Sequence, residues 1–270
     1  MAGKLVVITG GARGIGAATA RAVVAEGARI AIGDLDEDLA QRTVKELGVD
    51  GFAMRLDVTD HAGYTAFLDE LERELGPIDV LINNAGIMPL ALLDEESDDA
   101  TARVIAINLA AVIHGTREAM QRMKPRHSGH IVNIASLAGK VGVAGGATYC
   151  ASKHGVVGLS EAAHFELRGT GVDLTCVMPT IVRTELAAGL KQTRLSSQVG
   201  PEDVAAAIVA ALHRPRLDVY VPGYLGWASN VVRVLPRRAG EFIARATGTD
   251  QVFASAVNSP ERVGYESRIE

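Results

Sequence analysis

The sequence predicts a doubly wound α/β fold, with a seven-stranded, mostly parallel sheet that carries helices on both faces. Three observations lead to this expectation. Seven short β-branched or apolar runs alternate with helical stretches along the 270 residues. The runs are continuously apolar instead of strictly alternating, which is typical of parallel strands buried on both faces. A glycine-rich turn joins the first run directly to the first helical stretch.

The expected strands are read from these runs in chain order. They are KLVVIT at 4–9, RIAIGD at 29–34, GFAMRLDV at 51–58, DVLINNAG at 79–86, HIVNIAS at 130–136, VDLTCVM at 172–178 and DVYVP at 218–222. The helical stretches between them are expected at 14–27, 37–47, 62–75, 98–124, 149–169 and 201–212. No repeat or linker interrupts this order. We therefore expect one domain, 1–270, in which 223–270 form a helical C-terminal extension.

Composition argues against several classes of protein. A formal net charge of −5 argues against nucleic acid as a main partner, because phosphate binding needs a basic surface. No run of about 20 apolar residues occurs, so no integral membrane segment is expected, and the run LVVI is too short for a signal peptide. The histidines form no metal-ligand pattern. Cys150 and Cys176 fall in apolar segments, so we expect them to lie in the core and not to form a disulfide framework. A reduced, cytoplasmic setting fits these features.

The turn TGGARGIG at 9–16 has the features of a dinucleotide-binding loop. Gly10, Gly14 and Gly16 lie between a strand and a helix, where backbone N–H groups and a helix N-terminus can approach a pyrophosphate. A tight turn without a ligand is the alternative. An acidic residue about 20 positions further on favours the binding role, because Asp34 at the end of the second strand can accept hydrogen bonds from the adenosine ribose.

Asp34 also predicts the choice of cofactor. A carboxylate at this position repels a 2′-phosphate, and no arginine follows it in GDLDEDLA, so NAD is favoured over NADP. A helix N-terminal carboxylate is the alternative role for Asp34. Arg13, inside the glycine turn, is either a partial ligand of such a phosphate or a solvated flank.

Tyr149 and Lys153 are four residues apart in TYCASKHG, so in a helix they share one face. A neighbouring ammonium favours the phenolate and is expected to lower the pKa of Tyr149 from its ordinary value of about 10. Such a pair suits a general acid/base for a hydroxyl or carbonyl substrate. The spacing alone is weak support and gains weight only with further motifs.

Four segments in this order, TGGARGIG (9–16), NNAG (83–86), IVNIAS (131–136) and YCASK (149–153), resemble the motifs of the short-chain dehydrogenase/reductase family. The resemblance extends over residues 4–222 and implies a Rossmann fold. It implies that Tyr149 transfers the proton at the substrate oxygen, that Lys153 lowers the pKa of Tyr149 and binds the nicotinamide ribose, and that Ser136 orients the oxygen. Asn108, in VIAINLAAV, would hold a water that links Lys153 to solvent.

The same resemblance implies the contacts with NAD. The residues that it places at the cofactor are Gly10, Arg13, Gly14, Ile15, Gly16, Asp34, Asp57, Val58, Asn83, Asn84, Ala85, Gly86, Tyr149, Lys153, Pro179, Val182 and Thr184. One residue departs from the family pattern, because Thr180 in MPTIVRT stands where the family usually has glycine. A β-branched residue disfavours a positive φ, so the loop after the sixth strand is expected to turn differently.

These features together predict an NAD-dependent oxidoreductase that interconverts a secondary alcohol and a ketone. The alternatives are an NADPH-dependent 3-oxoacyl thioester reductase and a non-catalytic dinucleotide-binding regulator. The candidate pocket segments, 87–93, 137–147 and 184–190, are mostly apolar and carry no cluster of arginines. They favour a small hydrophobic alcohol or ketone as substrate.

The resemblance also implies self-assembly into a homotetramer, or else a dimer. The contact is expected on the helices at 98–124 and 149–169, where Val156, Val157, Leu159 and Ala163 would meet a second copy.

Residues 224–248 mix apolar side chains, including Trp227, with several arginines, and Pro236 should divide them into two short helices. We expect this segment to pack on the domain or on a partner subunit and to cover the substrate cleft. A segment that lies at a membrane surface is the alternative.

Overall fold

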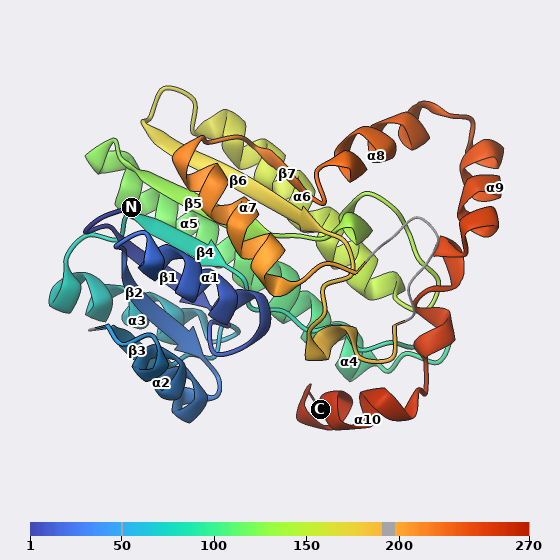
Figure 1. The fold of residues 1–270 in the computed structure, drawn as a ribbon, viewed down its shortest axis with the longest axis horizontal. Coiled ribbons are helices and arrows are strands. Elements are labelled where there is room, and N and C mark those ends of the chain that lie inside the picture. The colour runs from blue at the N-terminus through green and yellow to red at the C-terminus, as the bar shows by residue number, and fades with distance from the viewer. Residues whose placement is uncertain (50, 191–197, 270) are drawn as a thin grey trace.

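The computed structural model describes residues 1–49, 51–190 and 198–269, and its centre is a seven-stranded sheet (Figure 1). The strands are β1 (Leu5–Thr9), β2 (Arg29–Asp34), β3 (Phe52–Arg55), β4 (Val80–Asn83), β5 (Gly129–Ile134), β6 (Val172–Pro179) and β7 (Asp218–Val221). Their order across the sheet is β3-β2-β1-β4-β5-β6-β7, and each neighbouring pair is parallel. The predicted doubly wound fold is therefore confirmed, with a sheet that is wholly parallel over the described residues.

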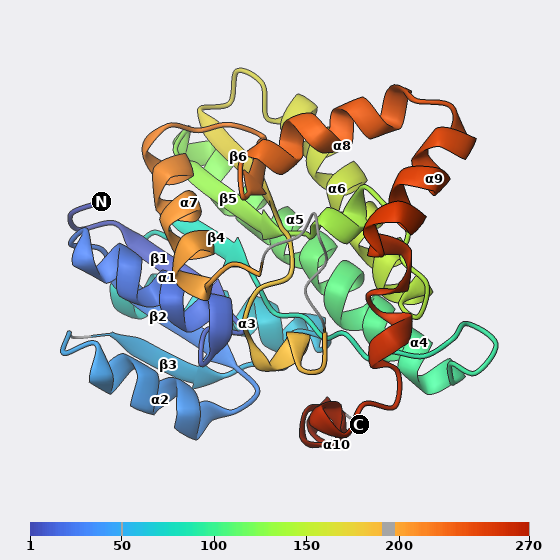
Figure 2. The same ribbon diagram turned by 45° about the vertical axis from the view of Figure 1, so that its right-hand side comes forward.

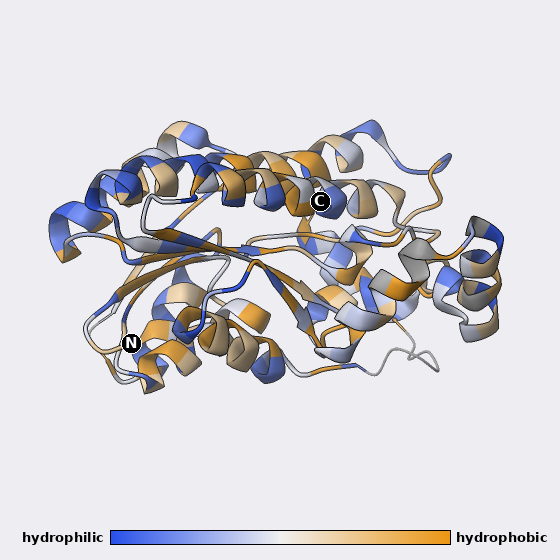
Figure 3. Cartoon of the chain, turned by 90° about the horizontal axis from the view of Figure 1, so that it is seen from above, coloured by the Kyte–Doolittle hydropathy of each residue, from blue (hydrophilic) through white to orange (hydrophobic). Residues whose placement is uncertain are grey.

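Helices cover both faces of this sheet, as Figure 3 shows. Within β1, Val6 and Ile8 point into one core and Leu5 and Val7 into the other, because successive side chains of a strand alternate. The first core is covered by α1 (Gly14–Ala25), α2 (Glu37–Glu46) and α7 (Pro201–His213), and the second by α3 (His61–Leu75), α5 (Ala111–Met123) and α6 (Ala147–Glu166). Burial on both faces explains why the strand sequences are continuously apolar.

Four strands end earlier than the sequence predicted, β3 and β4 by the most and β5 and β7 by less. β3 ends at Arg55, opposite the last residue of β2, so the chain beyond it has no neighbouring strand to pair with. β4 ends at Asn83, opposite the last residue of β1, where the glycine turn leaves the sheet. Residues 56–58 and 84–86 therefore lie in loops at the carboxyl edge of the sheet, where doubly wound folds bind their ligands.

The helix expected at 98–124 is irregular in its middle. α4 (Asp98–Ile105) passes into a π-helical turn, Ala106–Ala110, before α5 begins at Ala111. Such turns are frequent at functional sites. Asn108 lies in this turn, and its side chain is fully buried.

The prediction of which side chains of α6 would meet a second copy was largely wrong. Val156, Val157 and Ala163 are at most 6% exposed, because α6 uses them to pack on its own domain. The large apolar side chains that these helices do expose are Ile105, Ile113 and Phe165.

The C-terminal extension leaves the sheet after the edge strand β7 and returns to its carboxyl edge (Figures 1 and 2). α8 (Tyr224–Val234) and α9 (Arg237–Thr247) are separated at Pro236, as the sequence predicted. Both helices lie outside the α/β layers, and the chain then runs on to α10 (Val263–Ile269). None of the described helices is long and apolar enough to cross a membrane.

Candidate active site

A cavity of about 680 Å³ opens along the carboxyl edge of the sheet. It extends from the ends of β1 and β2 to the C-terminal extension, past the point between β1 and β4 at which the strand order reverses. The predicted site residues that line it are Gly10, Arg13, Gly14, Ile15, Asp34, Asp57, Val58, Asn84, Ala85, Gly86, Ser136, Tyr149, Lys153, Pro179, Val182 and Thr184. Gly16, Asn83 and Asn108 are not among its lining residues.

The glycine turn depends on two positive φ angles and two close approaches. Gly10 and Gly14 have φ of +64° and +55°, a region that favours glycine. A Cβ on Gly10 would lie 2.8 Å from Ala85 Cα, and one on Gly16 would lie 2.3 Å from Gly10 O. Gly16 therefore acts by letting α1 pack against the turn and not by facing the cavity. The result is a cradle without side chains at a helix N-terminus, which fits a pyrophosphate.

Asp34 is fixed at the tip of β2. One carboxylate oxygen accepts a hydrogen bond from Ala12 N at 2.9 Å, and the other accepts one from Asp36 N at 3.1 Å. Arg13 is held nearby, with its guanidinium 2.7 Å from Asp36 and 3.5 Å from Glu185. Asp34 thus presents a carboxylate at one end of the cavity, and Arg13 is already engaged by acidic partners.

The loop after β4 is tied to the glycine turn. Asn84 Nδ2 donates to Thr9 O at 3.0 Å and to Gly10 O at 2.8 Å. Asn83 corrects the prediction, because it points into the core, is 3% exposed and accepts a hydrogen bond from Tyr64 Oη at 3.0 Å. It belongs to the strand, whereas Asn84 lies in the loop beyond it.

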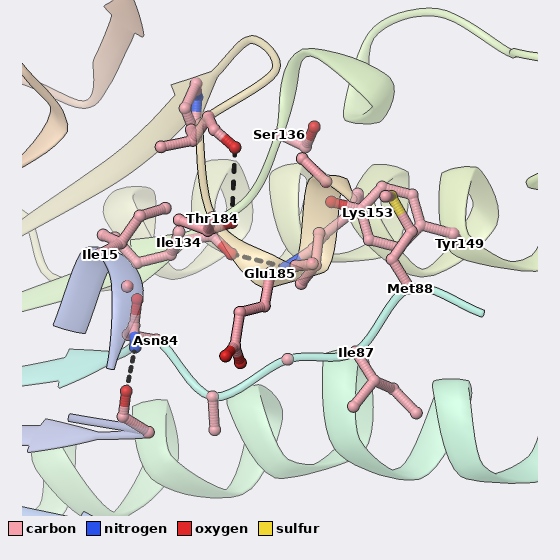
Figure 4. Close-up of a pocket in the computed structure, with 18 of the residues that line it drawn as sticks. Ile15, Asn84, Ile87, Met88, Ile134, Ser136, Tyr149, Lys153, Thr184 and Glu185 are labelled. Carbon is pink, nitrogen blue, oxygen red and sulfur yellow. Dashed lines mark hydrogen bonds between the residues drawn. The ribbon is translucent and has the colours of Figure 1, made fainter. Parts of the chain in front are cut away.

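Tyr149 and Lys153 lie near the start of α6 and both line the cavity, with Ser136 beside them (Figure 4). Lys153 Nζ donates to Ile134 O at 2.8 Å and lies 5.9 Å from the centre of the Tyr149 ring. Ser136 follows the end of β5 at the carboxyl edge. The predicted sharing of one helix face by the phenol and the ammonium is confirmed.

The electrostatics of this pair differ from the prediction. Burial raises the pKa of Tyr149, and hydrogen bonding with Ser136 opposes the rise. Burial lowers the pKa of Lys153 to about 8, since an ammonium is costly away from water. The expectation that the pKa of Tyr149 lies below its ordinary value was wrong, because burial is the largest effect on the phenol.

Asn108 acts on the site through the backbone. Its side-chain amide donates to Ile87 O at 2.7 Å and accepts from Ile87 N at 2.8 Å. A Cβ on Gly86 would lie 3.3 Å from Asn108 Oδ1 and 3.8 Å from Lys153 Nζ, so the loop passes close to both groups. Asn108 therefore fixes the loop after β4, and its role in a water relay stays a prediction.

The loop after β6 accommodates Thr180 without a positive φ, as expected for a β-branched residue. The Thr180 N–H donates to Val221 O of the neighbouring strand at 2.9 Å. Further along this loop, Thr184 lies close to the glycine turn, because a Cβ added to Gly14 would be 3.3 Å from Thr184 Cγ2. This loop therefore closes against the glycine turn.

The far end of the cavity is apolar, and the three predicted pocket segments contribute to it. Their apolar lining residues are Ile87, Met88, Leu137, Ala138, Val141, Val143, Leu186, Ala187 and Leu190. A further wall, which the sequence did not predict, is formed by Thr249, Val252, Phe253, Tyr265, Arg268 and Ile269.

The predicted cover of the cleft was placed too early in the chain. Among the side chains that the structure describes in α8 and α9, none lines the cavity, and Trp227 and Phe242 are 75% and 72% exposed. Residues 249–269 take that place instead. They carry no motif and no regular apolar period that would have identified them.

The cavity thus combines a cradle for phosphates, a carboxylate that can face a ribose, and a buried phenol beside an apolar chamber. These residues fit a nicotinamide dinucleotide bound across the switch point of the sheet. Tyr149 and Ser136 bring two hydroxyl groups to the cavity, an arrangement that can exchange a proton with an oxygen atom and hold that atom by a hydrogen bond.

Comparisons with known proteins agree with this geometry. A family model described as short chain dehydrogenase matches residues 4–195. The cis-4-hydroxycyclohexanecarboxylate dehydrogenase of Sinomonas cyclohexanicum is 39% identical over 217 residues, which cover 76% of this chain and 87% of that protein. The 3-oxoacyl-(acyl-carrier-protein) reductase FabG of Salmonella typhimurium is 33% identical over 215 residues, which cover 76% of this chain and 88% of that protein. A crystal structure of a short chain dehydrogenase/reductase from Burkholderia phymatum in complex with NAD has a TM-score of 0.79 and 29% sequence identity, and covers 86% of this chain and 93% of that chain.

Proposed function

Because the chain belongs to the short-chain dehydrogenase/reductase family, we propose that it is an NAD-dependent oxidoreductase that interconverts a hydrophobic secondary alcohol and its ketone. Enzymes of this family are oxidoreductases that act on CH–OH groups, so the chain is one as well. The preference for NAD and the hydrophobic character of the alcohol are what we propose. The observation that carries it is one cavity lined by Asp34 at one end and by Tyr149, beside apolar walls, at the other.

The reaction needs a proton acceptor, a holder for the oxygen and a hydride acceptor. When bound, NAD supplies the hydride acceptor. Tyr149 takes the proton from the alcohol oxygen as the C–H bond electrons leave with the hydride and the C=O bond forms. Ser136 holds the same oxygen by a hydrogen bond. The charge of Lys153, 5.9 Å from the Tyr149 ring, favours the phenolate against the burial that disfavours it. Lys153 would also hold the nicotinamide ribose when NAD is bound, and would pass the proton on toward a water held by Asn108.

The proposed preference for NAD rests on Asp34. A carboxylate at the tip of β2 accepts hydrogen bonds from the ribose hydroxyls and repels a 2′-phosphate. Arg13 is paired with Asp36 and Glu185, so its guanidinium is not free to bind that phosphate. These contacts argue against an NADPH-dependent thioester reductase. A non-catalytic regulator would have no need of Ser136, Tyr149 and Lys153 together at one cavity.

The proposed substrate is uncharged and apolar. Arg13 and Arg268 line the cavity, but both are ion-paired with Glu185, at 3.5 and 2.8 Å. They are therefore engaged and do not form a clamp for a carboxylate or phosphate. Apart from Ser136 and Lys153, the walls near Tyr149 are mostly aliphatic and aromatic side chains, which favour a cyclic, terpenoid, steroid or long-chain alcohol.

A panel of such alcohols, offered with NAD and with NADP, tests the proposal. Reduction of the nicotinamide is followed by absorbance, and Tyr149→Phe is the matched control. Turnover with NAD that the variant loses would support the proposal. Preference of the wild type for NADP by kcat/KM, or an enzyme that binds NAD but converts no alcohol or ketone, would contradict it.

We also propose that the protein is a cytoplasmic homo-oligomer, a tetramer or a dimer. Ile105, Ile113 and Phe165 are 36%, 40% and 59% exposed on α4, α5 and α6, and a second copy could cover them. Both cysteines are free and buried, in keeping with a reducing compartment. A monomeric mass by light scattering at micromolar concentration would contradict the assembly.

A further inference from the structure

The segment Thr249 to Ile269, which we term the C-terminal strap, lies against the apolar end of the cavity. Two loops of the cavity meet it through glycines. A Cβ on Gly145 would lie 2.6 Å from Ala254 N, and one on Gly146 would lie 2.6 Å from Phe253 Cδ2. On the loop after β6, a Cβ on Gly189 would lie 2.8 Å from Ser259 Oγ. The strap therefore approaches these loops as closely as backbone without side chains allows.

Arg262 is the one charged side chain of the described residues that is 0% exposed. Its Nη2 donates to Met88 O at 2.6 Å, and its Nη1 donates to Ala188 O at 2.9 Å and to Leu186 O at 3.2 Å. Its Nε donates to Glu266 Oε1 at 2.8 Å, which supplies the counter-charge. A guanidinium is buried only when such partners compensate for the loss of water.

The carbonyl groups that Arg262 binds belong to two separate walls of the cavity. Met88 lies in the loop after β4, and Leu186 and Ala188 lie in the loop after β6. One rigid fork of donors therefore fixes the distance between these walls. A lysine at the same position would offer its donors from a single nitrogen and could not bridge the walls in the same way.

The strap also brings two aromatic rings to the reacting end of the cavity. Phe253 meets Tyr149 edge-on, with ring centres 6.0 Å apart. Tyr265 is 8% exposed, lines the cavity and accepts a hydrogen bond from Met88 N at 2.8 Å. Anything that displaces the strap therefore alters the surroundings of the catalytic phenol.

We propose that Arg262 is a positioning residue that sets the width of the substrate pocket, and that the C-terminal strap it anchors determines which alcohols fit. The proposal deepens the function inferred above and rests on it only for the kinetic part of its test. The adenosine end of the cavity is built from the glycine turn and the loops after β2 and β3, and the hydrogen bonds of Arg262 go to the loops after β4 and β6 and to Glu266 instead.

The test compares Arg262→Met and Arg262→Lys with the wild type. Arg245→Met is the matched control, because Arg245 is an exposed arginine of the same extension. Amide hydrogen exchange is followed in segments 86–90 and 185–190, and it should become at least about tenfold faster in Arg262→Met. For the best alcohol of the panel, KM should rise about tenfold while kcat and NAD affinity stay within about threefold.

Arg262→Lys should recover part of both effects, and Arg245→Met should show neither. Exchange that stays slow in both segments of Arg262→Met would overturn the positioning role. The role in specificity would be overturned by either of two results. One is faster exchange while KM stays unchanged for every alcohol of the panel. The other is a kcat that falls by the same factor for every alcohol while KM does not change. If Arg262→Met fails to fold, the same criteria apply to Arg262→Lys. A wild type that converts no alcohol would refute the proposed function, and the exchange result would still decide the positioning role.

Discussion

Burial of the Lys153 ammonium is expected to destabilise the fold at neutral pH. The side chain is 5% exposed, and burial lowers its pKa from 10.5 to about 8. Below pH 8 the lysine is protonated in the folded and the unfolded chain, and the folded chain bears a cost of about 3 kcal/mol. Between the two pKa values the unfolded chain binds more protons, so this cost is relieved as the pH rises.

Lys153→Met removes the charge and keeps most of the side-chain volume. It also leaves Ile134 O without the donor that Lys153 provides at 2.8 Å, which costs about 1–3 kcal/mol at any pH. The pH dependence is therefore the decisive quantity. The free energy of unfolding of the wild type minus that of the variant should rise by about 2 kcal/mol between about pH 7 and about pH 9.5.

Urea unfolding of the cofactor-free proteins, followed by circular dichroism at several pH values, gives this difference directly. Groups that titrate in both proteins cancel, which isolates the lysine. Lys45→Met is the matched control, because Lys45 is exposed on α2 and carries no burial cost. A difference for Lys153→Met that stays flat, or that falls as the pH rises, would refute the reasoning.

Three further changes test the cofactor and catalytic roles. Tyr149→Phe should lower kcat by at least about 100-fold with little change in NAD affinity measured by calorimetry, because only the proton-transferring hydroxyl is lost; a wild-type kcat would contradict this. Asp34→Ser should raise the ratio of kcat/KM for NADP to that for NAD by at least about tenfold, and an unchanged ratio would remove Asp34 from cofactor selection. Gly16→Ala places a Cβ 2.3 Å from Gly10 O, so the melting temperature and the NAD affinity should both fall, and an unchanged melting temperature would show that the turn can relax.

The sheet and the polar end of the cavity were predictable because their sequence signals are local. Each strand carries its own apolar run, and the glycine turn lies between a strand and a helix in the sequence itself. The spacing of Tyr149 and Lys153 fixes their shared face as soon as the segment is helical. Asp34 is found by its distance from the turn. None of these inferences needs knowledge of a distant partner.

The misplaced details depend on neighbours that the sequence does not name. Asn83 and Asn84 are adjacent amides, and only the point at which β1 stops decides which one stays in the sheet. The pKa of Tyr149 is set by how much protein surrounds the phenol, which spacing along a helix does not report.

The position of the C-terminal strap could not be predicted either, because it too depends on contacts with residues that are distant in the sequence. Composition places an arginine such as Arg262 on the surface, since charged side chains are rarely buried without partners. Its partners are backbone carbonyl groups at residues 88, 186 and 188, and a carbonyl leaves no trace in the sequence. The family match ends at residue 195, before the strap begins. The matched part of the chain therefore contains Ser136, Tyr149 and Lys153, while the strap that lines the apolar end of the cavity lies in the part that the family model does not match.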